Sequence, residues 1–149
     1  MKSLSSYREL IVWQKSMDLA ARIYTITRSY PAEERFGITS QMRRAATSIP
    51  ANIAEGQARR STGEFLQSLG IARGSLAELE TFLTLSERLE LLAKTDSESL
   101  LNACAEINEE AWATLNSNTS RAFPKPKSGR IAVKVINHLG DEVMKVFKV

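Results

Sequence analysis

Residues 41–56 read QMRRAATSIPANIAEG, and this stretch carries the clearest structural signal in the chain. One side of it is apolar at the three-and-four spacing of a helix: Met42, Ala45, Ile49 and Ile53. The other side is polar at the same spacing: Gln41, Arg44, Ser48, Asn52 and Glu55. The pattern predicts a half-buried helix over residues 39–58. A kink is expected at Pro50, because a proline inside a helix lacks the N–H donor and clashes with the preceding turn.

Upstream, residues 7–29 carry two overlapping apolar sets at helical spacing. The first set is Leu10, Trp13, Met17, Ala20 and Tyr24, and the second is Val12, Leu19, Ile23 and Ile26. Together they form an apolar arc wider than a surface helix requires. This helix is therefore expected to be central or to face a second chain. Tyr30-Pro31 ends it, because the residue before a proline avoids helical backbone.

Downstream, two capping boxes mark the starts of helices: Ser61-Thr62-Gly63-Glu64 and Thr95-Asp96-Ser97-Glu98. The first opens a helix over residues 61–92, and the second opens a helix over residues 95–115. Helices joined by short connections pack as antiparallel neighbours. The chain is therefore predicted to be all-α, an up-down-up-down antiparallel four-helix bundle. A three-helix domain with a loose fourth helix is the alternative.

The sequence changes character after residue 123. Pro124-Lys125-Pro126-Lys127 is typical of a linker, so two regions are predicted, the bundle at 1–123 and a linker with a C-terminal extension at 124–149. The extension is rich in Val and Ile and divides around Gly140 into two β-prone runs, which favours a short β-hairpin. A two-stranded hairpin is only marginally stable alone. The extension is therefore expected to dock on something, to pair with another chain or to be partly disordered.

Composition is that of an ordinary globular protein, with 149 residues of which 43% are hydrophobic and 25% charged. No apolar run reaches the roughly 18 residues of a membrane span, and residues 1–10 lack the apolar core of a signal peptide. A single cysteine cannot form an internal disulfide. These features predict a cytoplasmic protein with no membrane partner.

Charge is unevenly distributed along the chain. Residues 1–60 carry 10 Lys/Arg against 5 Asp/Glu, residues 61–120 carry 3 against 10, and residues 121–149 carry 7 against 2. A chain with basic ends and an acidic middle can pair its own halves or pair with copies of itself. It can also present a basic face to phosphates.

Residues suited to catalysis or metal binding are scarce. The chain has one histidine, His138, and one cysteine, Cys104, and no ligand cluster surrounds either, so no metal site is expected. Gly70 and Gly74 lie inside a predicted helix and do not form a phosphate-binding loop. Their small size would instead let a neighbouring helix come close. The sequence therefore predicts a protein that is not an enzyme and needs no cofactor.

Two features point to binding. Arg43-Arg44 and Arg59-Arg60 are candidate nucleic-acid contacts, because arginine can clamp phosphates with two hydrogen bonds. The alternative is that these arginines pair with the acidic helices of the same chain. The second feature is the row Arg44, Ser48, Asn52 and Glu55, which is interpreted as internal, since a buried polar row can fix the register between helices or subunits.

Several motifs resemble one known family. They are Trp13-Gln14, Phe36-Gly37, Gln41-Met42-Arg43-Arg44-Ala45-Ala46, Ser48-Ile49, Asn52-Ile53-Ala54-Glu55-Gly56, Phe65 and the run from Ala72 to Glu80. Over residues 7–112 the chain resembles the four-helix-bundle proteins encoded in intervening sequences of bacterial 23S ribosomal RNA genes. That family is related to the accessory variability protein of diversity-generating retroelements, which binds its reverse transcriptase and nucleic acid. The C-terminal extension departs from the family pattern.

The resemblance implies a homo-oligomer, a pentamer with a central channel, without enzymatic activity. It makes Arg43, Arg44, Arg59 and Arg60 candidate nucleic-acid contacts. The residues interpreted as structural or interface positions are Trp13, Gln41, Ser48, Asn52, Glu55 and Gly74. Two functions are therefore expected: binding of RNA or an RNA-associated complex through a basic surface, or a protein-interaction scaffold, for example for a reverse transcriptase, that does not touch nucleic acid. An enzyme of unrecognised type is the third hypothesis.

Overall fold

A computed structural model of the chain describes residues 6–59, 62–115, 129–136 and 142–148. The chain divides into two compact units, Met1–Asn116 and Ser117–Val149. The boundary predicted from sequence, after residue 123, falls outside the described residues. The first unit contains the residues on which the functional hypotheses rest.

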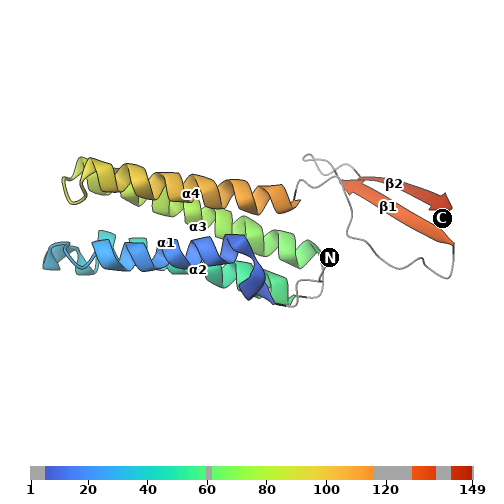
Figure 1. Cartoon of the computed structure of the whole chain (residues 1–149), viewed down its shortest axis with the longest axis horizontal. Helices are drawn as coiled ribbons and strands as arrows, with labels where there is room; N and C mark the ends of the chain where they lie inside the picture. The colour runs from blue at the N-terminus through green and yellow to red at the C-terminus, as the bar shows by residue number, and fades with distance from the viewer. Residues whose placement is uncertain (1–5, 60–61, 116–128, 137–141, 149) are drawn as a thin grey trace. The chain divides into compact units, whose positions relative to one another are not determined.

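The first unit is a four-helix bundle, as predicted (Figure 1). Its helices are α1 (Ile11–Ile26), α2 (Ile38–Ala58), α3 (Thr62–Arg88) and α4 (Lys94–Leu115). Two short 3₁₀ turns accompany them, η1 (Tyr7–Glu9) before α1 and η2 (Ala32–Arg35) before α2. Each helix packs against the next in sequence, and α4 packs against α1. This closed order of neighbours is that of an up-down-up-down bundle.

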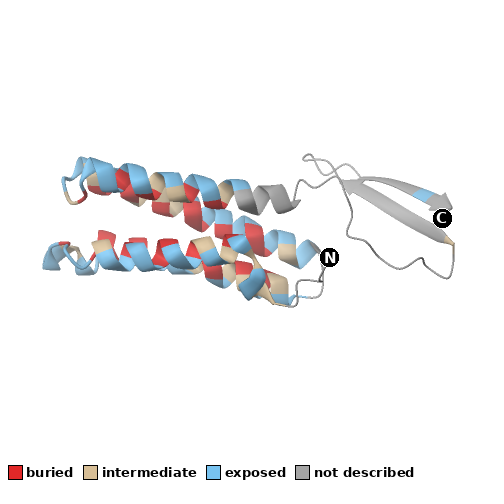
Figure 2. Cartoon of the chain, viewed as in Figure 1, coloured by how far each residue is buried: buried red, intermediate tan, exposed pale blue. Residues whose placement is uncertain are grey.

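The core follows the predicted helical stripes, and Figure 2 shows the buried positions on the sides of the helices that face one another. From α2 all four predicted apolar residues are buried, and α3 buries a stripe at the same helical spacing: Leu69, Ala72, Leu76, Leu79 and Leu83. Leu19, Ile23, Met42, Leu79 and Leu83 have at most 1% of their surface exposed. On α1 the second predicted apolar set is mainly buried: Val12, Leu19 and Ile23 are buried and Ile26 is half-buried. From the first set only Ala20 is buried. Met17 and Tyr24 remain 45% and 43% exposed.

Helix ends differ from the predictions at two places. The helix predicted from residue 7 is interrupted at Leu10, whose backbone is extended (φ −73°, ψ 121°), so that η1 is separate from α1. α3 ends at Arg88 and not at residue 92. Its end is a Schellman turn, in which Glu90 has φ 58° and the Leu91 N–H donates to the Ser86 carbonyl at 2.9 Å. Glycine usually occupies the left-handed position, so the sequence carried no signal for this turn.

The α2–α3 contact depends on Gly56, which the sequence analysis did not single out for packing. A Cβ atom at Gly56 would lie 2.7 Å from the Ser68 Cβ, closer than side-chain carbons pack. The expectation that Gly70 and Gly74 admit a neighbouring helix is wrong within one chain. A Cβ atom at either position would meet nothing within 4 Å.

α2 continues through Pro50, which is buried. Two residues later, the Asn52 side-chain amide donates to the Ser48 carbonyl at 2.8 Å. The prediction that Thr95 caps α4 is wrong, because α4 begins at Lys94 and Thr95 lies inside its first turn. The box predicted at Ser61 lies outside the described residues.

The second unit contains the hairpin that the sequence favoured. Strands β1 (Arg130–Ile136) and β2 (Glu142–Lys148) pair antiparallel, with Ile131 opposite Phe147 and Val135 opposite Val143. The residues predicted to form the turn between them, around Gly140, lie outside the described residues.

Candidate functional site

Arg43 and Arg44 are adjacent in sequence but point to different neighbours. The Arg44 guanidinium donates to the Glu78 carboxylate of α3 at 2.6 Å and to the Gln41 side-chain oxygen at 2.9 Å. The Arg44 side chain nevertheless keeps 67% of its surface exposed. Gln41, a predicted interface residue, therefore orients Arg44.

Arg43 turns the other way, toward α1. Its Nε donates to the Thr27 hydroxyl at 2.8 Å, and its guanidinium carbon lies 4.9 Å from the centre of the Tyr24 ring. A guanidinium over an aromatic face is attracted by the electrons of the ring. Arg43 is therefore half-buried and bound within the chain. Arg43 and Arg44 therefore face different neighbours, because consecutive helical residues point about 100° apart.

Arg59 ends α2 between two carboxylates. Its guanidinium forms ion pairs with Glu55, one turn earlier, and with Glu64 of α3 at 3.4 Å. Hydrogen bonding and charge from Glu55, with the charge of Glu64, raise the pKa of Arg59. Internal pairing with acidic residues, the alternative considered from sequence, is therefore present at Arg44 and Arg59. Arg60 lies outside the described residues.

The polar row of α2 lies along the edge of its contact with α3. The Ser75 hydroxyl of α3 donates to the Ser48 hydroxyl at 2.8 Å, and the Asn52 amide also donates to that hydroxyl at 3.0 Å. The Ser75–Ser48 bond ties α2 to α3 at one position along the two helices. The prediction that the whole row is internal is wrong, because Arg44 and Glu55 are exposed and Ser48 and Asn52 are half-buried.

Trp13 lines a groove between α1 and α2. The ring of Trp13 meets Tyr7 edge-on, with 5.3 Å between the ring centres. The groove has a volume of about 430 Å³. We call it the α1–α2 groove, and its lining is Tyr7, Trp13, Met17, Ala20, Ala21, Tyr24, Thr47, Pro50, Ala51 and Ala54. None of these residues is charged, so the groove suits apolar contact.

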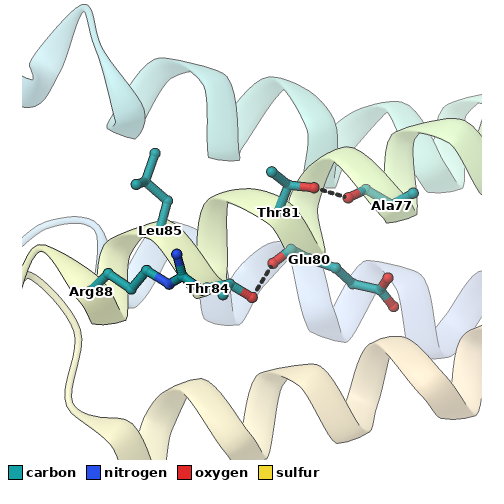
Figure 3. Close-up of a pocket in the computed structure, with 6 residues that line it drawn as sticks. All are labelled: Ala77, Glu80, Thr81, Thr84, Leu85 and Arg88. Carbon is teal, nitrogen blue, oxygen red and sulfur yellow. Dashed lines mark hydrogen bonds between the residues drawn. The ribbon is translucent and has the colours of Figure 1, made fainter.

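An uncharged row of residues lies on the outer side of α3. We define the outer face of α3 as this row, Gly63, Gln67, Gly70, Gly74, Ala77, Thr81 and Leu85, with Leu66 and Ile71 beside it and Glu78 between the row and Ile71. Figure 3 shows part of this face, where a shallow hollow of about 580 Å³ is lined by Ala77, Glu80, Thr81, Thr84, Leu85 and Arg88. Gly74, a predicted interface residue, lies in the middle of the row. The sequence analysis missed the face as a whole. The signal that could have revealed it is the lack of charge on this row before Arg88.

The described residues give little support for a thiol nucleophile or a metal site. Cys104 is fully buried, and desolvation raises the pKa of its thiol to about 12, so it stays protonated at neutral pH. Within the described ranges, no group of three or more His, Cys, Asp or Glu side chains is placed to hold a metal ion. His138 lies outside them. None of the described helices is both long enough and apolar enough to cross a membrane.

The fold and these motifs agree with comparisons to known proteins. The model of the family described as 23S rRNA-intervening sequence protein matches residues 8–112. The chain belongs to this family. The resemblance inferred from sequence is thereby confirmed, and the C-terminal hairpin lies beyond the matched range.

One solved structure similar to this family member is a crystal structure, at 1.70 Å resolution, of a protein from Bacteroides thetaiotaomicron VPI-5482. It is described as a protein with unknown function from the S23 ribosomal protein family. The two chains share 31% identity with a TM-score of 0.67, over 72% of this chain and 96% of the other. No curated protein matches the chain. The similarity therefore supports the bundle and the family, and function has to be argued from the surface.

Proposed function

We propose that this chain is a non-enzymatic, self-associating bundle that binds RNA through the arginines of α2. The observation that supports RNA binding is the exposure of Arg44 and Arg59, whose side chains are 67% and 49% accessible although each is ion-paired. The proposed subunit number, five, rests on the family resemblance. The proposed location is the cytoplasm, where RNA is accessible.

The ion pairs do not prevent phosphate binding. Exposed ion pairs contribute only about 0–1 kcal/mol each, because water screens both charges. The carboxylates of Glu55, Glu64 and Glu78 are about 35% to 54% exposed and can return to water at small cost. A phosphate offers arginine the same paired acceptor geometry as a carboxylate. Binding several phosphates also releases counterions, which favours binding at low salt.

The test is binding of a structured RNA to the full chain at several salt concentrations, measured by fluorescence anisotropy. We expect the affinity to fall steeply as the salt concentration rises. For each tenfold increase in salt, the logarithm of the association constant should fall by roughly one unit per phosphate contact. Changing Arg43, Arg44, Arg59 and Arg60 together to Ala should weaken binding at least tenfold and flatten the slope. The matched control is Arg22→Ala, because Arg22 is an exposed arginine of α1 bonded to Ser99. Affinity that does not depend on salt, or that is unchanged by the fourfold variant, would contradict RNA binding.

A protein-interaction scaffold is the second candidate, and the uncharged outer face of α3 favours it. Leu66, Ile71 and Leu85 are 38–51% exposed there, which suits contact with another protein. A partner recovered with the chain after nuclease treatment, and retained by the fourfold arginine variant, would support this function. Loss of all partners on nuclease treatment would favour RNA binding.

A further inference from the structure

We propose that Phe36 is a stacking platform for one unpaired RNA base, and that Arg35 beside it holds a phosphate of the same strand. This inference rests on the proposed RNA binding and deepens it, because it assigns the bound RNA to single strands or loops rather than to paired duplex. Bases inside a duplex are stacked on one another, whereas unpaired bases are free to stack on an aromatic side chain.

Phe36 is far more exposed than a large apolar side chain usually is. It has 86% of its surface exposed, and the next most exposed large apolar residue in the described part of the chain, Val146, has 62%. Phe36 lies in the connection between α1 and α2, at one end of the bundle (Figure 1). Contact of an aromatic ring with water is unfavourable. A ligand that covers the ring would therefore be bound in part by removing it from water.

The turn that carries Phe36 is closed by hydrogen bonds on both sides of the ring. The Glu34 N–H donates to the Pro31 carbonyl at 3.0 Å, and the Gly37 N–H donates to the Glu34 carbonyl at 3.1 Å. The Phe36 carbonyl accepts from the Ser40 hydroxyl at 3.1 Å. The backbone of Phe36 is therefore fixed to the first turn of α2. A ring presented in this way loses little freedom when a base binds, which favours affinity.

Gly37 keeps this turn and the start of α2 together. The Glu34 carboxylate accepts the Ile38 N–H at 3.1 Å, which pairs a backbone donor that has no partner inside the helix. A Cβ atom at Gly37 would lie 2.6 Å from the Glu34 Oε2. Any other residue would therefore push the carboxylate away from the helix. The same contact holds one of the two carboxylates of this turn on the backbone.

The charge around the ring is positive. Residues 27–44 contain four arginines, Arg28, Arg35, Arg43 and Arg44, against two glutamates, Glu33 and Glu34. The Arg35 guanidinium carbon lies 5.7 Å from the centre of the Phe36 ring. Arg35 is exposed, and none of the ion pairs among the described residues includes it, unlike Arg44 and Arg59. Its guanidinium is therefore open to a phosphate that accompanies a base on the ring.

A strand stacked on Phe36 can also reach the arginine of α2 on which the proposed function depends. The Ser40 hydroxyl contacts the Phe36 carbonyl, and Arg44 lies four residues further on, on the same side of the helix. Arg44 is about 9 Å along α2 from Ile38, and its side chain is 67% exposed. The ring and the two cations can therefore bind neighbouring nucleotides of one strand.

The surroundings of Phe36 fit a base better than they fit the apolar surface of a protein. Protein contacts use contiguous apolar patches, whereas the nearest residues in this turn, Glu33, Arg35 and Gly37, are charged or lack a side chain and are all exposed. One base covers one ring and brings a phosphate to the cation beside it. Stacking accepts any base, so the inference names a kind of RNA and not a sequence.

Two RNAs with the same number of phosphates separate stacking from charge: an unstructured single strand and a fully paired duplex. Binding of each to the full chain is measured by fluorescence anisotropy. Phe36→Ala should weaken binding of the single strand roughly tenfold. It should leave duplex affinity and the salt dependence unchanged, because the ring is uncharged. Phe36→Trp should restore binding of the single strand. The matched control is Ile11→Ala, which removes a 56% exposed apolar side chain at the other end of α1 and should change neither affinity.

Arg35→Ala gives the complementary result. It should weaken binding of the single strand and lower its salt slope by about one unit, because it removes one phosphate contact. A fluorescent adenine analogue in the strand reports stacking directly, since stacking quenches its emission. We expect the emission to fall when the strand binds the wild type or the Arg35→Ala variant, and to fall much less with Phe36→Ala.

Each other outcome overturns the inference and is distinguishable from failure of the proposed function. If Phe36→Ala weakens both RNAs equally, or neither, the ring does not stack on an unpaired base. If it changes the mass of the protein by light scattering while RNA affinity stays the same, the ring contacts protein. Circular dichroism shows whether each variant is folded. If the wild type binds neither RNA, RNA binding falls together with the inference. If the fourfold arginine variant loses binding and Phe36→Ala does not, only the inference falls.

Discussion

The two sides of α3 are both poor in charge, yet only one is covered within the chain. The inner side places Leu69, Leu76, Leu79 and Leu83 in the core, with at most 5% of their surface exposed. The outer side carries glycines, Ala77 and threonines, and its larger apolar residues are about 40% to 50% exposed. Large side chains fill the space between helices of one chain, whereas the small ones leave a surface that another helix can approach. Hydropathy alone does not separate the buried side from the exposed one, because Leu66, Ile71 and Leu85 lie on the exposed side.

The largest expected difference between the two sides comes from removing a leucine on each. Leu79→Ala should lower the free energy of unfolding by about 2–5 kcal/mol, because it leaves a cavity in a fully buried site. Leu85→Ala, on the outer side, should change the stability of the subunit by less than about 1 kcal/mol, since Leu85 is 38% exposed. Urea denaturation followed by circular dichroism measures both. Equal losses for the two variants would show that the outer side is also packed within the subunit.

Much of this comparison could be predicted from sequence. The inner stripe of α3 and the apolar stripe of α2 follow from helical periodicity, because the core of a bundle repeats with the turns of its helices. The polar row of α2 was identified for the same reason, since Ser48 and Asn52 recur one turn apart. Periodicity gives the side of a helix on which a residue lies, and this was enough for the fold.

Other features depend on three-dimensional distances that spacing does not contain. Gly56 and Gly74 look alike in sequence, but only Gly56 faces a neighbouring helix of the same chain. Arg43 and Arg44 separate because one reaches Tyr24 on α1 and the other reaches Glu78 on α3. Each arginine was a reasonable candidate for phosphate binding. The partner of each arginine within the chain lies on a neighbouring helix, which spacing along the sequence does not reveal.

Cys104 is a fully buried residue of α4, and its thiol makes the stability of the bundle depend on pH. Burial raises the pKa of its thiol from 9.0 to about 12, and the charge of Glu80 adds to the effect. The folded state therefore holds the thiol proton more tightly than the unfolded chain. The stabilisation is complete below pH 9 and is lost as the pH rises from 9 toward 12. At pH 11 the loss should be about 2–3 kcal/mol relative to pH 8.

Denaturation of wild type and of Cys104→Ala at both pH values measures this contribution. The variant should lose less stability than the wild type between pH 8 and pH 11, and the difference belongs to Cys104. Tyr30, whose pKa burial also raises, is present in both proteins and cancels in the comparison. Rapid reaction of the native protein with a thiol reagent at pH 8 would contradict the assignment of a buried, protonated thiol.

The smallest expected effects have opposite signs at two glycines. Gly56→Ala places a Cβ atom 2.7 Å from the Ser68 Cβ and 3.0 Å from a Phe65 ring carbon, so α2 and α3 must move apart. We expect a loss of about 1–2 kcal/mol, an overpacking cost partly offset by the better helix propensity of alanine. Gly74→Ala meets nothing and should stabilise the single subunit by about 0.5–1 kcal/mol. Urea denaturation of both variants gives the two values.

A second substitution separates the clash at Gly56 from other causes. Ser68→Gly removes the carbon that the new Cβ would meet, so the double variant with Gly56→Ala should lose less stability than the two single changes added together. Strict additivity would mean that the cost of Gly56→Ala does not arise from contact with Ser68.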